Sequence, residues 1–125
     1  MTSQKLSSSA AAWPVVIFLS GLALYALTLA PDVLWGGGDF ARYQTEAYLL
    51  ELRVEDGILG HPLWVISAHP FTWLPIRTVA WRANLSAAVF AAGALALTFL
   101  ITRRLMKSNS AALLATAALA VSHTF

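Results

Sequence analysis

The sequence predicts an all-α integral membrane protein, and its composition and charge pattern lead to this class. Of its 125 residues, 58% are hydrophobic and 11% are charged, whereas soluble domains usually carry about 25% charged residues. Two segments, 12–30 and 84–101, contain no charged residue, and each is about long enough to cross a bilayer. The connection between them, 31–83, has apolar positions at helical spacing, so helices are expected there too.

Composition also excludes several classes of protein. There is no cysteine, so neither a disulfide framework nor thiol chemistry is available. The net charge is +2, and the basic residues are scattered or stand beside apolar segments. A nucleic-acid-binding protein needs a basic stripe or patch, so no nucleic-acid partner is expected.

The chain is expected to begin with a short leader and a first membrane helix. Residues 1–11 are small and polar, with Lys5 as their single charge, and residues 12–30 form the predicted first span. A signal peptide is the alternative, because a basic residue precedes the apolar run. The run is long for that role, and Pro31 follows Ala30 where cleavage would be expected.

A second and a third membrane segment are predicted in the C-terminal half. Residues 84–101 form the second span, in which alanines and Gly93 permit close approach of another helix. The following loop, 102–109, contains three basic residues and no acid: Arg103, Arg104 and Lys107. Residues 110–125 form a third helix, which is too short for a full crossing and is expected to be truncated.

The basic loop sets the expected orientation. Short loops rich in Lys and Arg remain in the cytoplasm, so 102–109 and the N-terminal leader are predicted to be cytoplasmic. The long loop 31–83 then lies on the outer face. The third segment returns toward that face and brings His123 to the same side of the membrane as Asp39.

The outer loop is expected to contain interfacial amphipathic helices. After three glycines, one apolar stripe recurs at helical spacing: Phe40, Tyr43, Ala47 and Leu50. A second apolar piece contains Trp64 and Trp73, and tryptophans near a span suit the headgroup layer. The loop is therefore predicted to lie on the membrane surface.

Asp39 stands where the glycines meet the first of these helices, and two interpretations are open. As a helix N-cap, an aspartate contributes about 1 kcal/mol. The reciprocal capping box is absent, because the residue three positions on is Arg42 instead of a glutamate. Alternatively, Asp39 is a reactive carboxylate at the membrane surface, which takes a proton from a hydroxyl or binds a metal.

The other candidate residues also carry two interpretations. His61 and His69 each precede a proline and suit exposed turns, and no metal-ligand spacing connects the histidines. Arg77 and Arg82 precede the second span, where a guanidinium can either bind a lipid phosphate or anchor the helix end.

Four blocks of the sequence resemble the N-terminal region of a known family. They are "LTLAPDVLWGGGDFARYQTEAYLL", "GHPLWVISAHPFTWLP", "VAWRANLSA" and the terminal "SHTF". In this order they resemble a bacterial membrane family related to protein O-mannosyltransferase-like GT-C glycosyltransferases. The resemblance covers nearly all of the chain from about Ala23 onward. It implies a multi-span protein of the inner (cytoplasmic) membrane that moves a sugar from a polyprenyl-phosphate carrier to an acceptor on the outer face.

The resemblance also implies roles for individual residues. Asp39 corresponds to the acid of the first outer loop that is essential for transfer, as a general base or as the ligand of a divalent metal. The family pattern usually has a second acid three residues later, where this chain has Arg42. The residues expected to bind the substrate or the carrier are Arg42, His61, Arg82 and His123.

The predicted function is therefore that of the N-terminal portion of a membrane glycosyltransferase. Family members continue for several hundred residues, so 125 residues alone are expected to be inactive and to need further spans or a partner subunit. The alternative is a small non-catalytic membrane protein that acts through helix–helix association. A transporter segment is less favoured, because neither full span has an ionisable residue at its middle.

Overall fold

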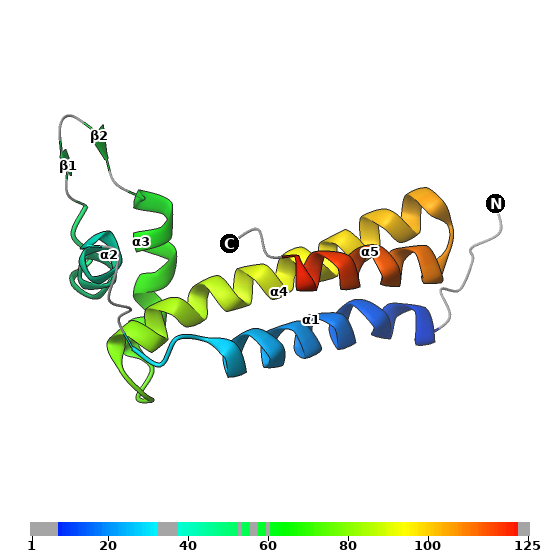
Figure 1. Cartoon of the computed structure of the whole chain (residues 1–125), viewed down its shortest axis with the longest axis horizontal. Helices are drawn as coiled ribbons and strands as arrows, with labels where there is room; N and C mark the ends of the chain where they lie inside the picture. The colour runs from blue at the N-terminus through cyan, green and yellow to red at the C-terminus, as the bar shows by residue number, and fades with distance from the viewer. Residues whose placement is uncertain (1–7, 33–37, 53, 56–57, 60, 123–125) are drawn as a thin grey trace. The chain divides into compact units, whose positions relative to one another are not determined.

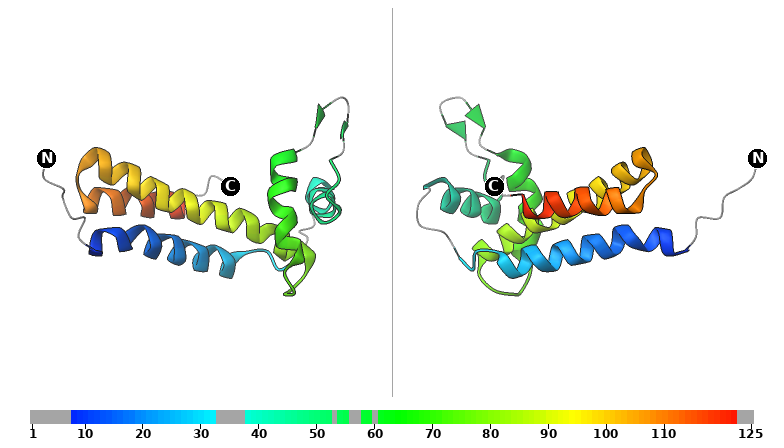
Figure 2. Two further views of the ribbon diagram at one scale, coloured as in Figure 1. Left: turned by 180° about the vertical axis from the view of Figure 1, so that it is seen from behind. Right: turned by 45° about the vertical axis from the view of Figure 1, so that its right-hand side comes forward.

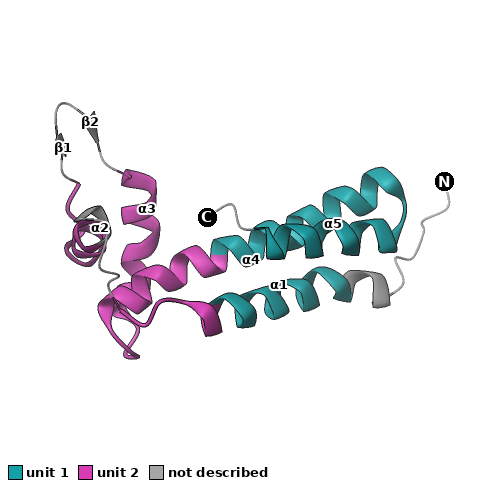
Figure 3. Ribbon diagram, viewed as in Figure 1, with its two compact units in different colours: residues 1–25, 90–125 teal, residues 26–89 magenta. Residues whose placement is uncertain are grey.

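The computed structural model describes residues 8–32, 38–52, 54–55, 58–59 and 61–122. The chain divides into two compact units, 1–25 with 90–125 and 26–89 (Figure 3). Figure 1 shows the order of the elements, which is α1 (Ser8–Thr28), α2 (Gly38–Leu49), β1 (Val54–Glu55), β2 (Ile58–Leu59), α3 (Pro62–Ala68), the 3-10 helix η1 (His69–Trp73), α4 (Val79–Met106) and α5 (Asn109–Val121).

Helices make up most of the described residues, as the sequence predicts. The exception is a small antiparallel hairpin in which Val54 pairs with Leu59 and Glu55 pairs with Ile58. This hairpin was not predicted from the sequence.

One described helix, α4, is long and apolar enough to cross a membrane. Its 28 residues extend about 42 Å and include the whole predicted span 84–101. The described apolar part of α1, Ala12–Thr28, and helix α5 are shorter. The prediction of two complete membrane helices is therefore not confirmed.

In the unit formed by 1–25 and 90–125, α1 approaches α4 at a glycine. A Cβ atom on Gly21 would lie 2.8 Å from Cδ1 of Leu95 and 3.6 Å from Cα of Ala92, so only glycine fits without a shift of Leu95. Nearby, the rings of Trp13 and Phe99 lie 6.4 Å apart. A Cβ atom on Gly93 would meet nothing within 4 Å, so Gly21, and not Gly93, permits the close approach among the described residues.

A two-residue turn separates α4 from α5. Lys107 has φ 53°, a left-handed conformation that ends α4, and its N–H donates to the Arg103 carbonyl at 2.9 Å. Ser108 caps α5, because its Oγ accepts from the Ala111 N–H at 3.3 Å. Arg103 and Arg104, expected in a loop, belong to the last turn of α4.

In the unit formed by 26–89, α2 packs against α3 and η1 (Figure 2). Its core is three fully buried alanines, Ala47 of α2, Ala68 of α3 and Ala83 of α4, with Trp64 packed against them. Because these side chains are small, the helix backbones come close together. The short helices of the predicted outer loop therefore form a packed structure on the first turns of α4.

The C-terminal end of α2 is closed by its own backbone. Leu50 has φ 54°, and the N–H of Glu51 donates to the Glu46 carbonyl at 3.0 Å. This is a Schellman-type ending. A leucine stands at the left-handed position, which glycine usually occupies.

Candidate functional site

Asp39 lies in the first turn of α2. The helix begins at Gly38, so Asp39 is its second residue and does not precede it as an N-cap would. An acid in this turn is favoured in its ionised form by the helix dipole. The side chain of Asp39 lies outside the described part of the structure.

The helix that carries Asp39 is fixed to the start of α4 by a pair of amides, of which Gln44 is buried and Asn84 is half-buried. Nε2 of Gln44 donates to Oδ1 of Asn84 at 3.1 Å, across 40 residues of sequence. Gln44 is 7% exposed, and its buried Oε1 atom accepts no hydrogen bond from the part of the chain that the structure describes. Because buried amides are costly to separate from their partners, this pair sets how α2 sits on α4.

Arg42 forms an ion pair with Glu46, which lies one helical turn further along α2. Its Nε donates to Oε1 of Glu46 at 2.7 Å, and Glu46 is 3% exposed while the Arg42 side chain is 23% exposed. A buried carboxylate is stable only when it is paired, so Arg42 compensates the charge of Glu46. Glu46 is not among the site residues predicted from the sequence, although opposite charges four residues apart on a helix are a recognisable signal of an ion pair.

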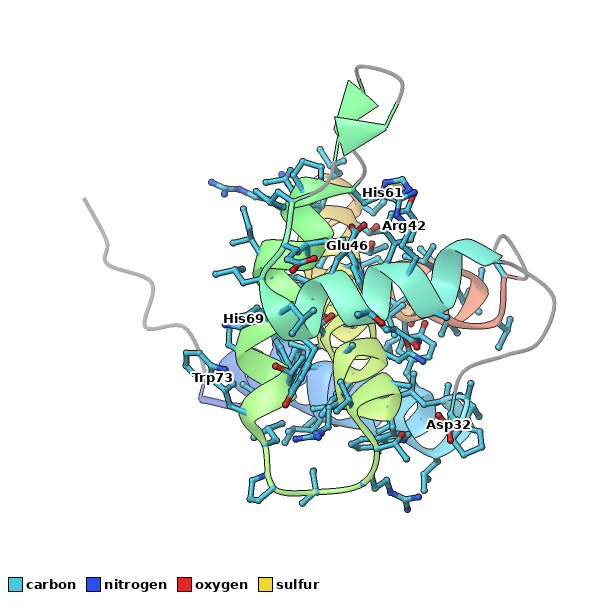
Figure 4. The ribbon with its side chains drawn as sticks, turned by 90° about the vertical axis from the view of Figure 1, so that its left-hand side faces the viewer. Asp32, Arg42, Glu46, His61, His69 and Trp73 are labelled. Carbon is cyan, nitrogen blue, oxygen red and sulfur yellow. The ribbon has the colours of Figure 1, made fainter. Side chains whose placement is uncertain are left out.

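His61 reaches α2 through an aromatic contact. It precedes Pro62 at the start of α3, makes no side-chain capping bond, and is exposed. Its ring meets the ring of Tyr43 edge-on at 4.9 Å, and Trp64 lies 6.5 Å from the same tyrosine. The Arg42 guanidinium lies over the same tyrosine ring, with Cζ 5.6 Å from its centroid, so the structure brings two predicted carrier-binding residues, Arg42 and His61, to one side of α2 (Figure 4).

His69 has a structural role. Its Nδ1 lies 2.7 Å from the Ala47 carbonyl, and a carbonyl only accepts, so Nδ1 carries the proton. This bond satisfies one of the last carbonyls of α2, which have no partner within the helix. The His69 ring also meets the Trp73 ring edge-on at 5.0 Å. The predicted exposed turn residue is instead a half-buried support for α2.

Arg82, which the sequence predicts to bind the carrier, donates hydrogen bonds to backbone carbonyls. Its Nη1 donates to the carbonyls of Thr72, at 2.6 Å, and Leu74, and its Nε donates to the carbonyl of Thr78 at 3.2 Å. These bonds hold the end of η1 on the first turn of α4. The remaining predicted carrier-binding residue, His123, lies outside the described residues.

An acid of the predicted outer loop can bind a divalent cation together with other carboxylate or imidazole ligands. Within the described ranges, no group of three or more His, Cys, Asp or Glu side chains is placed to hold a metal ion.

Comparison with known proteins gives one match. A family model described as the protein O-mannosyl-transferase TMEM260 N-terminal domain matches residues 56–125. The match includes His61 and Arg82, but Asp39 and Arg42 lie before it. No curated protein and no solved structure matches the chain significantly.

Proposed function

Because the chain belongs to the family of the protein O-mannosyl-transferase TMEM260 N-terminal domain, we propose that it forms the N-terminal region of a membrane glycosyltransferase. In the proposed reaction, a sugar passes from a polyprenyl-phosphate carrier to a hydroxyl group of an acceptor on the outer face of the membrane. The family supports a mannosyltransferase-related role. The carrier, the face of the membrane and the bacterial GT-C relationship are parts of the proposal.

The main structural support for this function is that α2 has a fixed position on the helices that follow it in the chain. Helix α2 precedes the residues that match the family, yet it packs on them through the Gln44–Asn84 pair, the buried Ala47 and the His69 bond. A catalytic group needs a fixed position relative to its substrate. A loop with its own core supports such a position for the first turn of α2, where Asp39 lies.

In this proposal Asp39 is the general base that takes the proton from the acceptor hydroxyl as the sugar is transferred. Arg42 and His61, on one side of α2, contact the carrier phosphate, which suits a guanidinium and an imidazole. Glu46 keeps the Arg42 side chain in place. His123 remains a proposed part of the carrier site on sequence grounds alone.

The proposed topology has two spans and a cytoplasmic N-terminus. The 21 residues of α1 extend about 31 Å, which matches the hydrocarbon thickness of a bilayer. Helix α5, with 13 residues, extends about 20 Å and does not cross alone. Arg103 and Arg104 in the last turn of α4 favour the cytoplasm for that end.

The test is Asp39→Asn in the natural gene product, with transfer of sugar from a polyprenyl-phosphate mannose donor as the measurement. We expect transfer to fall by about 10²- to 10⁴-fold, the usual contribution of a general base. Asparagine is tolerated near a helix start, so membrane insertion and the unfolding midpoint should remain unchanged.

Asp32→Asn is the matched control, because it removes one acid from the same loop outside α2. Its transfer activity should equal that of the wild type. Full activity of Asp39→Asn would refute the assignment of the base.

A second function, association with another membrane helix, is favoured by one face of α4. Gly93 has open space beside it, and apolar side chains on the same face are more than half exposed: Phe90, Leu97 and Ile101. If this face binds a partner helix, Gly93→Leu should dissociate the complex in detergent while Asp39→Asn leaves it intact. Sugar transfer would then depend on neither substitution.

A further inference from the structure

The segment from Trp73 to Trp81, which we name the anchor turn, connects η1 to the first turn of α4. Thr78 fixes it at two points: its Oγ1 accepts from the Trp81 N–H at 3.2 Å and donates to the Pro31 carbonyl at 3.1 Å. Arg82 binds the carbonyls of Thr72 and Leu74. The turn is therefore held rigidly where the apolar helix begins.

Within this turn Arg77 has an unfavourable backbone conformation. Its φ is 49°, in the left-handed region that costs a non-glycine residue about 1–2 kcal/mol. Its guanidinium lies over the Trp81 ring, with Cζ 5.3 Å from the ring centroid. Arg77 is exposed and makes no side-chain hydrogen bond to a described residue, whereas Arg82 is bound to three carbonyls.

Exposed apolar side chains precede the arginine along the anchor turn. Trp73 is 72% exposed, Ile76 is 48% exposed and Leu74 is 36% exposed. In Figure 4 the Trp73 side chain projects outward from η1. Exposed tryptophan and aliphatic side chains next to a cation, at the end of a helix that can span a bilayer, are typical of the membrane–water interface.

We propose that Arg77, stacked on Trp81, is a binding site for the phosphate of an anionic phospholipid headgroup, and that Trp73, Leu74 and Ile76 enter the adjacent acyl layer. A guanidinium can stack its face on an indole ring while its N–H groups bind two phosphate oxygens. Because α4 begins at Val79, two residues after Arg77, the site lies at headgroup level when α4 crosses the membrane. This proposal does not depend on sugar transfer.

The experiment uses the full chain in phosphatidylcholine vesicles that contain a fraction of phosphatidylglycerol with a photoreactive headgroup. After illumination, mass spectrometry locates the label along the chain. We expect labelling of the anchor turn, and Arg77→Gln should reduce it about fivefold, as expected for one basic side chain at an anionic surface.

Arg77→Gly separates binding from folding. Glycine adopts φ 49° without strain, so this variant should keep or raise the unfolding midpoint and still lose the label. Arg104→Gln removes the same charge from the other end of α4 and should leave the label on the anchor turn unchanged. Asp32→Asn should also leave it unchanged, because Asp32, which follows Pro31, is not part of the proposed site.

Four results would overturn the proposal. Unchanged labelling in Arg77→Gln would exclude the arginine as the binding group. Equal labelling by a phosphatidylcholine with the same photoreactive group would exclude selection of an anionic headgroup. Displacement of the label by inorganic phosphate at constant ionic strength would indicate a site for free phosphate. An equal loss in Asp32→Asn, next to the Pro31 carbonyl that Thr78 binds, would show that labelling depends on the fold of the turn and not on the charge of Arg77.

Discussion

The two compact units are stabilised by different kinds of contact. In the unit of 1–25 and 90–125, α1 meets α4 through Gly21, Ala92 and the Trp13–Phe99 rings. In the unit of 26–89, side chains bind one another or the backbone across long stretches of sequence. Examples are Gln44 with Asn84, Thr78 with Pro31 and His69 with Ala47.

The difference follows from the length of the helices and from the solvent. A long helix satisfies nearly all of its backbone groups internally, and in lipid its neighbours associate mainly through close packing of small residues. Short helices such as α2, α3 and η1 have a large fraction of unpaired terminal groups, which side chains must satisfy. Polar side chains therefore accumulate in 26–89, and the candidate catalytic chemistry lies there too.

The largest effect is expected from breaking the ion pair of α2. Arg42→Met keeps the length of the side chain and the helix propensity but leaves Glu46 buried without its cation. Loss of one partner of a buried pair costs about 3 kcal/mol, which chemical unfolding in detergent micelles should measure.

The matched variants test whether the buried charge causes this loss. Glu46→Gln should cost about 1 kcal/mol, because the amide oxygen still accepts from Arg42. The double variant Arg42→Met, Glu46→Met should recover most of the stability, since an apolar pair can replace an ion pair. A double variant no more stable than Arg42→Met would show that the loss has another origin.

The helices themselves could be predicted from the sequence, and the contacts that orient the site could not. Uncharged runs indicated α1 and α4, and the spacing of Tyr43 and Ala47 indicated α2. Which small residues face a neighbouring helix depends on how each helix is rotated about its axis. Of the alanines and Gly93 that the sequence indicated in α4, Ala92 does meet α1, but the glycine at this contact is Gly21 of α1 and not Gly93.

The role of Arg82 could not be predicted from the sequence either. Its partners are the carbonyls of Thr72, Leu74 and Thr78, and they converge only after the turn before α4 has formed. That turn depends in part on the bond from Thr78 to Pro31, 47 residues away. Local pattern alone therefore could not distinguish Arg82 from the exposed Arg77.

The next largest effect should appear in the other unit. Gly21→Leu places a branched side chain where even a Cβ atom would approach Leu95 to 2.8 Å. Overpacking of this kind lowers the free energy of unfolding by about 2 kcal/mol, which chemical unfolding in detergent should measure.

Gly93→Leu is the control, because it adds the same side chain to α4 in open space and should leave the stability of the isolated chain almost unchanged. Equal losses for the two variants would mean that close α1–α4 packing is not what stabilises this unit.

The smallest effect compares the same substitution in both units. Leu50 ends α2 with φ 54° and Lys107 ends α4 with φ 53°, and each conformation is strained for a residue with a Cβ atom. Leu50→Gly and Lys107→Gly should each raise the free energy of unfolding by about 1 kcal/mol, because glycine is the favoured residue at this helix-end position. If the units differ only in how side chains pack, the two gains will be equal, because the strain belongs to the backbone alone. A gain at Lys107 with a loss at Leu50 would show instead that the half-exposed leucine side chain stabilises the end of α2.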